Sequence, residues 1–319
     1  MTTSPATTRA RPYRRTGPWA RRRAVTLAVL GTSSFVVVAV TYLLSAQTVR
    51  GQRAENAVLR ARRNELRGGP TSATEILATV SVWSLVAAIA AVMAVALARR
   101  RPRLALGAGA VIGVSIVATE VLKKVILPRP ALDTDAPSWL IDNIFPSGHT
   151  TIAVATAVAF VLVVPYRLRG PAALIGGFYA AGLAAATLEA GWHRTSDAVG
   201  SVFLVLGMAL WACGALVWWR GAGRPPERQP PWAYLPLAAV AAVGGIVDIV
   251  GMPDTLRAID AGTLDDAGVR EAYVVGLGLV AVSVAVAMGV LLVALRTVSL
   301  DAPTPDGAAS ADHPEAPGA

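Results

Sequence analysis

Long apolar runs restrict the fold of this chain more than any other feature. A hydrocarbon core about 30 Å thick needs roughly 20 apolar residues per crossing helix. Because the runs are continuous and do not alternate, they favour helices over the strands of a membrane barrel. Eight runs approach or reach this length, the fourth being the shortest, and they cover residues 24–46, 75–98, 104–126, 149–165, 172–191, 198–219, 233–251 and 272–295.

The composition agrees with a membrane protein. Of the 319 residues, 54% are hydrophobic and only 15% are charged, which is far from the average for soluble domains. No soluble domain of useful size remains between the runs. We therefore expect an all-α fold, a polytopic integral membrane bundle of helices.

The basic residues gather in short clusters. The net charge is +9, and a positive chain can bind nucleic acid. Eight spans that start inside, however, place each basic cluster in the cytoplasm, as the positive-inside rule requires. We therefore expect a multi-pass protein of the cell membrane, with both termini cytoplasmic and no nucleic-acid partner. The clusters lie at residues 11–23, 99–103, 166–170 and 220–228.

One basic segment falls on the opposite, external side. Residues 48–69 carry six arginines and two glutamates. A solvated amphipathic helix is the favoured interpretation, because charged external loops of this kind are common. The alternative is that the segment collects anionic lipid headgroups.

The external connection between the third and fourth runs contains groups suited to binding phosphate. Lys123 and Lys124 end the third run, and Arg129 lies between two prolines. A guanidinium offers a fork of donors and an ammonium a point charge, and both suit phosphate oxygens. "PSGH", residues 146–149, then opens the fourth run, so amides near Ser147 and Gly148 should lie at a helix N-terminus, which attracts anions.

The next external connection contains "EAGWHRTSD", residues 189–197. His193 and Asp197 are four residues apart, so one helical turn brings the carboxylate within reach of the imidazole. A carboxylate that holds one imidazole nitrogen protonated makes the other nitrogen a better nucleophile or base. Two of the three histidines in the chain, His149 and His193, thus lie on external connections on one side.

Together these motifs resemble those of the type 2 phosphatidic acid phosphatase superfamily, membrane lipid-phosphate phosphatases related to vanadium haloperoxidases. That family has a Lys followed by Arg-Pro, then Pro-Ser-Gly-His, then Ser-Arg followed by His-x-x-x-Asp. The matching residues here are Lys123 with Arg129, "PSGH" at 146–149 and "HRTSD" at 193–197. The resemblance covers roughly residues 75–219.

The resemblance implies a mechanism. His193 attacks phosphorus to give a phosphohistidine, Asp197 orients it, and His149 protonates the leaving oxygen. Water then releases phosphate, and no metal or other cofactor takes part. The residues that bind the phosphate oxygens are Lys123, Arg129, Ser147 and Gly148.

The chain departs from the family pattern at two points. The family usually has six residues between its Lys and Arg, whereas five follow Lys123 and four follow Lys124. Lys123 is therefore the preferred candidate, although Lys124 stays open. The Ser-Arg pair falls at Ala186 and Thr187, so the phosphate-gripping arginine is absent. Arg194 or the arginines of residues 48–69 are candidates to replace it.

The expected substrate is a lipid phosphate or polyprenyl (pyro)phosphate, hydrolysed at the external membrane face. One alternative is a phosphotransferase that uses the same site, and another is a catalytically silent relative that binds or transports anionic lipid. The sequence predicts neither the lipid nor the oligomeric state. The expected organisation is a basic cytoplasmic N-terminus (1–23), a six-span phosphatase core (24–219), a cytoplasmic linker (220–232), two extra C-terminal spans (233–295) and a disordered cytoplasmic tail (296–319).

Overall fold

A computed structural model describes residues 17–65, 72–133, 142–222, 230–263, 265–298 and 300. Most of the expected basic N-terminus and nearly all of the expected tail lie outside these residues, as does part of the expected linker. Parts of the external segments 48–69 and 123–151 also lie outside them.

All regular secondary structure of the described residues is helical, which confirms the all-α prediction. Short 3-10 helices at Tyr166–Leu168 and Pro231–Ala233 join the longer helices, and a π-helical turn at Leu122–Ile126 extends α5. The α-helices of the described parts are α1 (Pro18–Ala46), α2 (Val49–Glu65), α3 (Ser72–Ala78), α4 (Val82–Ala98), α5 (Pro102–Val121), α6 (Gly148–Val163), α7 (Arg169–Glu189), α8 (Thr195–Arg220), α9 (Leu235–Asp260) and α10 (Asp266–Leu295).

Six helices in the described parts are long and apolar enough to cross a membrane, namely α1, α5 with its π-helical turn, α7, α8, α9 and α10. The chain is thus a multi-pass membrane protein by helix composition. The two other predicted spans differ from the long helices. α6 has 16 residues, which gives it a length of about 24 Å, and the run at 75–98 is divided between α3 and α4.

The break in the second predicted span has a local cause. α3 and α4 meet at 64°, and Ser81 lies at the N-cap of α4, where its hydroxyl accepts a hydrogen bond from the amide of Ser84 at 3.2 Å. The hydroxyl of Ser84 in turn accepts a hydrogen bond from the amide of Ser81 at 2.8 Å. Serines that bond the backbone in this way compete with helix continuation, so an apolar run that reads as one span becomes two helices.

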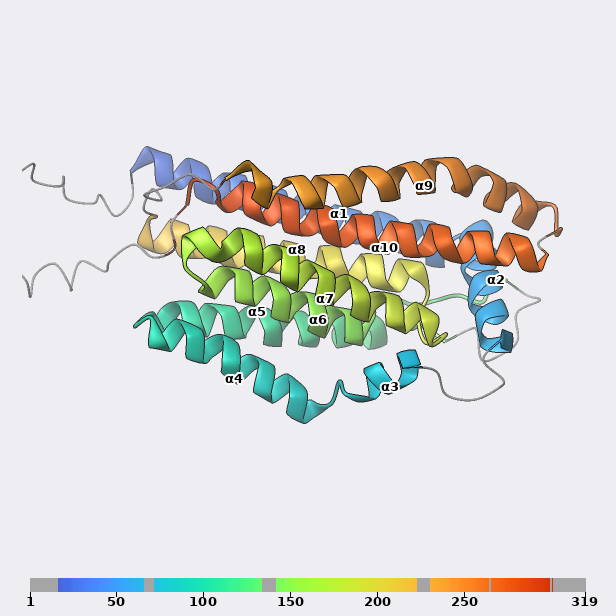
Figure 1. Cartoon of the computed structure of the whole chain (residues 1–319), viewed down its shortest axis with the longest axis horizontal. Helices are drawn as coiled ribbons and strands as arrows, with labels where there is room; N and C mark the ends of the chain where they lie inside the picture. The colour runs from blue at the N-terminus through green and yellow to red at the C-terminus, as the bar shows by residue number, and fades with distance from the viewer. Residues whose placement is uncertain are drawn as a thin grey trace, which may run out of the picture.

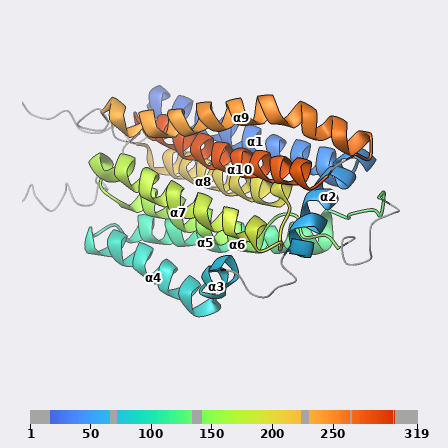
Figure 2. The ribbon, with the colours of Figure 1, turned by 45° about the vertical axis from the view of Figure 1, so that its right-hand side comes forward.

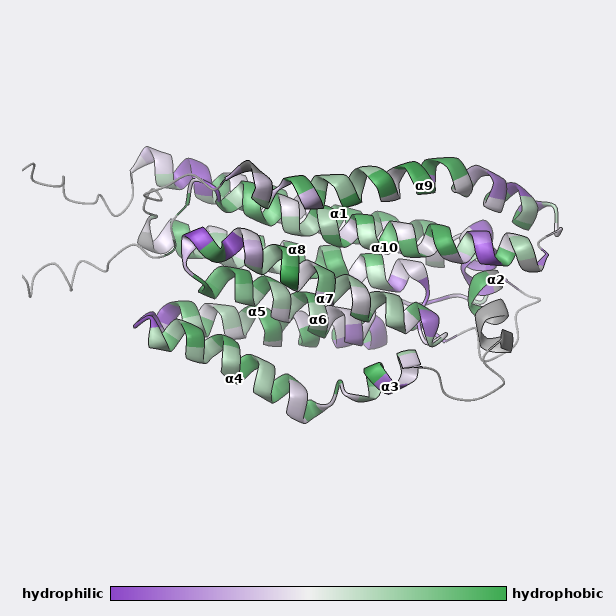
Figure 3. Ribbon diagram, in the orientation of Figure 1, coloured by the Kyte–Doolittle hydropathy of each residue, from purple (hydrophilic) through white to green (hydrophobic). Residues whose placement is uncertain are grey.

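The helices run side by side as a bundle, with α8 inside it (Figure 1). α8 packs against α1, α5, α6 and α10, whereas α9 packs mainly against α10 and lies on the outside (Figures 1 and 2). Many apolar side chains of α9 face outward, among them Ile249 and Val250, which are 76% and 68% exposed. Figure 3 shows apolar residues along the middle of the bundle and polar residues near its ends, as a bilayer requires.

Small residues let the central helices approach closely. A Cβ at Gly207 of α8 would lie 2.5 Å from the ring of Phe35 on α1, and one at Gly176 of α7 would lie 2.9 Å from the Cβ of Ala157 on α6. Both distances are too short for a real contact. Glycines at such crossings are typical of membrane helix pairs, in which packing drives association.

The two ends of the bundle differ. α6 begins at Gly148 and ends at Val163, whose carbonyl accepts a hydrogen bond from Arg99. Arg169 bonds the carbonyl of Val298 in the same region, at 3.2 Å. The basic connections around residues 99–103 and 166–170 thus lie at the opposite end of α6 from "PSGH".

α2 lies across the end of the bundle that carries "PSGH" (Figure 1). It contacts α1, α9 and α10 and buries Gln52, Asn56 and Leu59. Its arginines are partly outward: Arg50 pairs with Asp260 at 2.6 Å, with both side chains about half exposed. The predicted solvated helix is therefore solvated on one face only, and its other face covers residues of the bundle.

Candidate active site

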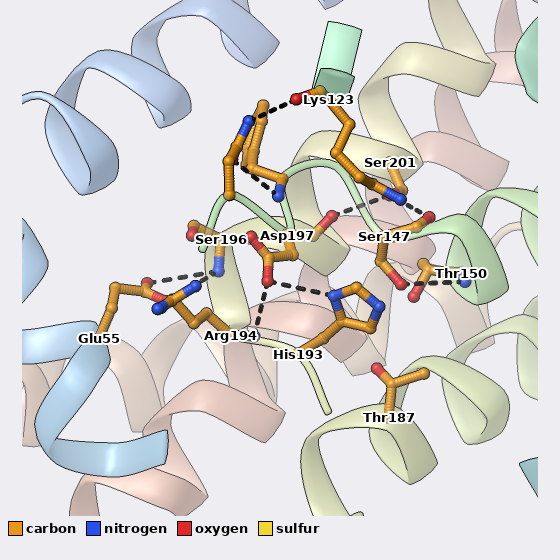
Figure 4. A network of polar contacts seen from close by, with 12 residues as sticks. Glu55, Lys123, Ser147, Thr150, Thr187, His193, Arg194, Ser196, Asp197 and Ser201 are labelled. Carbon is orange, nitrogen blue, oxygen red and sulfur yellow. Dashed lines mark hydrogen bonds and ion pairs between the residues drawn. The ribbon is translucent and has the colours of Figure 1, made fainter. Parts of the chain in front are cut away.

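His193 and Asp197 lie at the start of α8, where the chain enters the helix from the short connection after α7. His193 Nδ1 and Asp197 Oδ2 are 3.2 Å apart, and the same carboxylate oxygen accepts a hydrogen bond from the amide of Arg194 at 2.8 Å. Asp197 is buried. The four-residue spacing therefore acts as the sequence predicts, and it leaves Nε2 of His193 as the nitrogen that does not face Asp197 (Figure 4).

The start of α6 is joined to the start of α8. The amide of Ser147 donates to the carbonyl of Asp197 at 3.1 Å, and the hydroxyl of Ser201 donates to the carbonyls of Ser147 and Asp197, both at 2.8 Å. Ser147 also caps α6, because its Oγ accepts a hydrogen bond from the amide of Thr150 at 3.3 Å. These bonds hold the two histidine-bearing segments together.

His149 occupies the first turn of α6 and faces the connection that carries His193. Its ring centroid lies 5.4 Å from that of Trp192, and both His193 and Lys123 are close enough to act on it electrostatically. Within the described residues, the amides of Gly148 and His149 donate no hydrogen bond to a backbone acceptor outside α6. These two amides are therefore the ones at this helix N-terminus that can receive an anion.

The two lysines of the first motif differ in placement. The ammonium of Lys123 lies 3.9 Å from where a Cβ at Gly148 would be, and its side chain is 17% exposed. The side chain of Lys124 is 70% exposed. Both pair with Glu120, at 3.1 and 2.9 Å. The structure thus brings Lys123 to the start of α6, while Lys124 points toward solvent.

Arg129 and Arg194 meet at Asn56 of α2. The Oδ1 of Asn56 accepts hydrogen bonds from Arg194 at 3.1 and 3.3 Å and from Arg129 at 3.4 Å, and its Nδ2 donates to Asp133 at 2.9 Å. Burial lowers the pKa of Arg129 to about 10, and the nearby charge of Arg194 acts in the same direction. Two guanidiniums are thus held next to each other, close to Asp197.

α2 supplies further contacts that the motifs do not indicate. The side-chain oxygen of Gln52 accepts from the amides of Leu132 and Asp133 at 3.2 and 3.3 Å, and its Nε2 donates to the carbonyl of Pro130 at 2.6 Å. Gln52 therefore fixes the segment that follows Arg129. The sequence signal for these contacts is limited to uncharged polar side chains among the arginines of residues 48–69.

Glu55 of α2 is partly buried against the start of α8. Its carboxylate accepts from the amide of Ser196 at 3.3 Å, and Figure 4 shows it beside Arg194 and Ser196. Burial is the main reason that its pKa is raised to about 7, and repulsion from Asp197 adds to the increase. A carboxyl group thus titrates near neutral pH within the site.

Thr187 occupies the place where the family motif has arginine. It is buried in α7, its hydroxyl donates to the carbonyl of Ala184 at 2.7 Å, and its own carbonyl accepts from the amides of Trp192 and His193 at 3.0 and 3.2 Å. Thr187 therefore shapes the turn below His193 (Figure 4). Arg194 follows this turn, and its guanidinium donates to Asn56 of α2.

The arrangement suits the transfer of a phosphoryl group. It combines a carboxylate-oriented imidazole, a second imidazole, a helix N-terminus with receptive amides, an ammonium and two guanidiniums. A phosphoryl group in transfer carries charge on three equatorial oxygens, and donors of this kind around the phosphorus stabilise that charge. The site residues predicted from the sequence thus lie together at one end of the bundle. The amide of Ser147, however, already donates to the carbonyl of Asp197.

One of three comparisons with known proteins finds a match. Residues 81–221 match the PAP2 superfamily, whereas comparisons with curated proteins and with solved structures gave no match. The matched segment runs from the N-cap of α4 to just beyond α8 and includes every predicted site residue. It excludes α1, α2, α3, α9 and α10. The chain therefore contains a PAP2 superfamily domain, which spans residues 81–221.

Proposed function

We propose that the protein is a phosphatase that hydrolyses a lipid phosphate or polyprenyl (pyro)phosphate through a phosphohistidine on His193. Members of the PAP2 superfamily are typically phosphatases, which supports the reaction class. The observation that carries the proposal is the contact between His193 Nδ1 and the buried carboxylate of Asp197 at 3.2 Å. That contact fixes the tautomer in which Nε2 carries the lone pair of a nucleophile.

The first step forms one bond and breaks another. Nε2 of His193 attacks phosphorus while the bond from phosphorus to the alkoxy or phosphate leaving group breaks. His149 gives its proton to the leaving oxygen as a general acid. Asp197 stabilises the positive charge that develops on the imidazole of His193.

The second step reverses these roles. Water attacks the phosphohistidine, His149 accepts a proton from that water, and the bond from Nε2 to phosphorus breaks to release inorganic phosphate. The equatorial oxygens would be held by Lys123, Arg129 and the amide of Gly148, and by the hydroxyl proton of Ser147, whose Oγ accepts from the amide of Thr150. These groups are ones that electrostatic catalysis requires.

The same proposal places the site at the external membrane face. The basic connections around residues 99–103 and 166–170 lie at the other end of the bundle, and the positive-inside rule assigns that end to the cytoplasm. Arg194 takes the place of the missing motif arginine, since it is buried beside Asn56. An amphiphilic substrate fits because the site lies at one end of the spans.

Phosphate release tests the proposal. Purified protein in detergent with EDTA would be given phosphatidic acid, phosphatidylglycerol phosphate and undecaprenyl pyrophosphate, and wild type would be compared with His193→Ala. We expect release from at least one substrate that the variant abolishes. The matched control is Arg50→Ala, on the exposed face of α2, which should match wild type within twofold. Folded wild type that releases nothing from any substrate would contradict the proposal.

A further inference from the structure

A cavity of about 90 Å³ lies between α9, α10, α2 and the beginning of α8. Most of its lining is apolar and comes from the two C-terminal spans, with Met252, Leu256 and Ile259 on α9 and Val275 and Leu279 on α10. α2 adds Val58 and Leu59. The PAP2 superfamily match ends at residue 221, so the lining from α9 and α10 lies outside the matched domain.

The same cavity reaches the catalytic segment. His193, Arg194 and Thr195 line it together with the apolar residues, and Glu55 lines it from α2. One cavity thus joins the segment that carries the proposed nucleophile to an apolar surface. A ligand that fills both regions must combine a charged head with a hydrocarbon part, because apolar side chains favour hydrocarbon over water.

α10 is fixed to both ends of the connection that carries His193. The hydroxyl of Tyr273 donates to Glu189, the last residue of α7, at 2.5 Å. A Cβ at Gly276 would lie 2.6 Å from the Oγ1 of Thr195, so α10 touches the first residue of α8 as closely as a glycine allows. The position of the apolar wall relative to His193 is therefore set by contacts on either side of it.

We infer that α9 and α10 form a binding site for the hydrocarbon chain of an amphiphilic phosphate substrate. The site would hold the methylenes nearest the phosphoryl group. This inference rests on the proposed function, because it takes His193 as the group that meets the phosphate. The substrate class stays the one already proposed, a phosphate or diphosphate ester of a long hydrocarbon chain; the inference adds where that chain binds. It also gives the two C-terminal spans a role in selectivity.

A substitution that fills the cavity tests the inference. Leu256→Trp places a larger side chain in the cavity, and Val250→Trp places the same side chain on the exposed face of the same helix. Each variant would be compared with wild type on glycerol 3-phosphate, dioctanoyl phosphatidic acid and dioleoyl phosphatidic acid. Leu279→Trp repeats the test from α10.

We expect Leu256→Trp and Leu279→Trp to lower kcat/KM at least about tenfold for the long-chain substrate, since lost room for a few methylenes has an effect of this size. Activity on glycerol 3-phosphate should stay within twofold of wild type. Val250→Trp should leave activity on all three substrates within twofold of wild type. Equal losses on glycerol 3-phosphate and dioleoyl phosphatidic acid, or no loss on any of the three substrates, would overturn the inference.

Photolabelling gives a readout that needs no hydrolysis. An alkyl phosphonate with a diazirine near its head cannot be cleaved, and light attaches it to the residues around its chain. We expect label on peptides of α9 and α10, competition by dioleoyl phosphatidic acid, and loss of that label in Leu256→Trp but not in Val250→Trp. Label confined to other helices would refute the chain site.

The two experiments separate the two proposals. Specific label at α9 and α10 with no phosphate release from any substrate would support the hydrocarbon site and contradict the hydrolase. Phosphate release that depends on His193, combined with label confined to other helices, would support the hydrolase and contradict the hydrocarbon site. Each of these results therefore contradicts one proposal and supports the other.

Discussion

Replacing Asn56 by alanine removes one amide that organises several charged groups. Its oxygen accepts from Arg194 at 3.1 Å and from Arg129 at 3.4 Å, and its nitrogen donates to Asp133 at 2.9 Å. A hydrogen bond to a charged group contributes about 1.5–3 kcal/mol. The contact with Arg129 is near the limit of a hydrogen bond, so the expected catalytic effect comes from Arg194 alone.

If that energy holds Arg194 against a phosphate oxygen in the transition state, Asn56→Ala should lower kcat/KM about 10- to 150-fold. The assay is phosphate release under kcat/KM conditions, with the melting temperature measured alongside. Asn56→Asp keeps an acceptor for both guanidiniums and should recover part of the loss, which a packing defect would not. Arg50→Ala on the same helix is the control and should change activity less than twofold.

Wild-type kcat/KM within twofold in Asn56→Ala would show that Asn56 has no part in positioning Arg194. Equal losses in Asn56→Asp and Asn56→Ala would contradict that role too, since retention of the acceptor would then have no effect.

Two further predictions concern carboxyl groups. Asp197→Asn should lower kcat at least about 100-fold with little change in KM, because His193 loses the partner that fixes its tautomer; a loss below tenfold in steady-state assays would contradict the assigned role. The pKa of Glu55 is raised from 4.5 to about 7, chiefly by burial, so its contribution to stability is complete below pH 4.5 and is lost as pH rises through 7. The melting temperature of wild type should therefore fall relative to that of Glu55→Gln between pH 4.5 and 7, and parallel curves would show that the pKa is not raised.

The sequence predicts those parts of the molecule that depend on local pattern. Continuous apolar runs indicate helices, and the spacing from His193 to Asp197 places both groups on one turn. The family resemblance names Lys123 as a candidate, and the structure places its ammonium beside Gly148. By contrast, a single predicted span at 75–98 was divided, because an apolar average does not register the reciprocal bonds between Ser81 and Ser84.

Contacts between distant segments account for the rest. Asn56 meets Arg129 across 73 positions and Arg194 across 138 positions, and no periodicity in residues 48–69 reveals those partners. The amide of Ser147 was expected to face an anion, yet it bonds the carbonyl of Asp197. Likewise, the apolar runs at 233–251 and 272–295 indicate two spans but not a cavity that reaches His193.

The most direct test of the account is to trap the intermediate. Rapid acid-free quenching of the wild-type protein with phosphatidic acid labelled in its phosphate, followed by digestion and mass spectrometry, would locate the phosphoryl group. The account predicts a label that is labile in acid and stable in alkali on the peptide that contains His193, absent from His193→Ala. Substrate turnover without any such label, or a label on another residue, would contradict catalysis through His193.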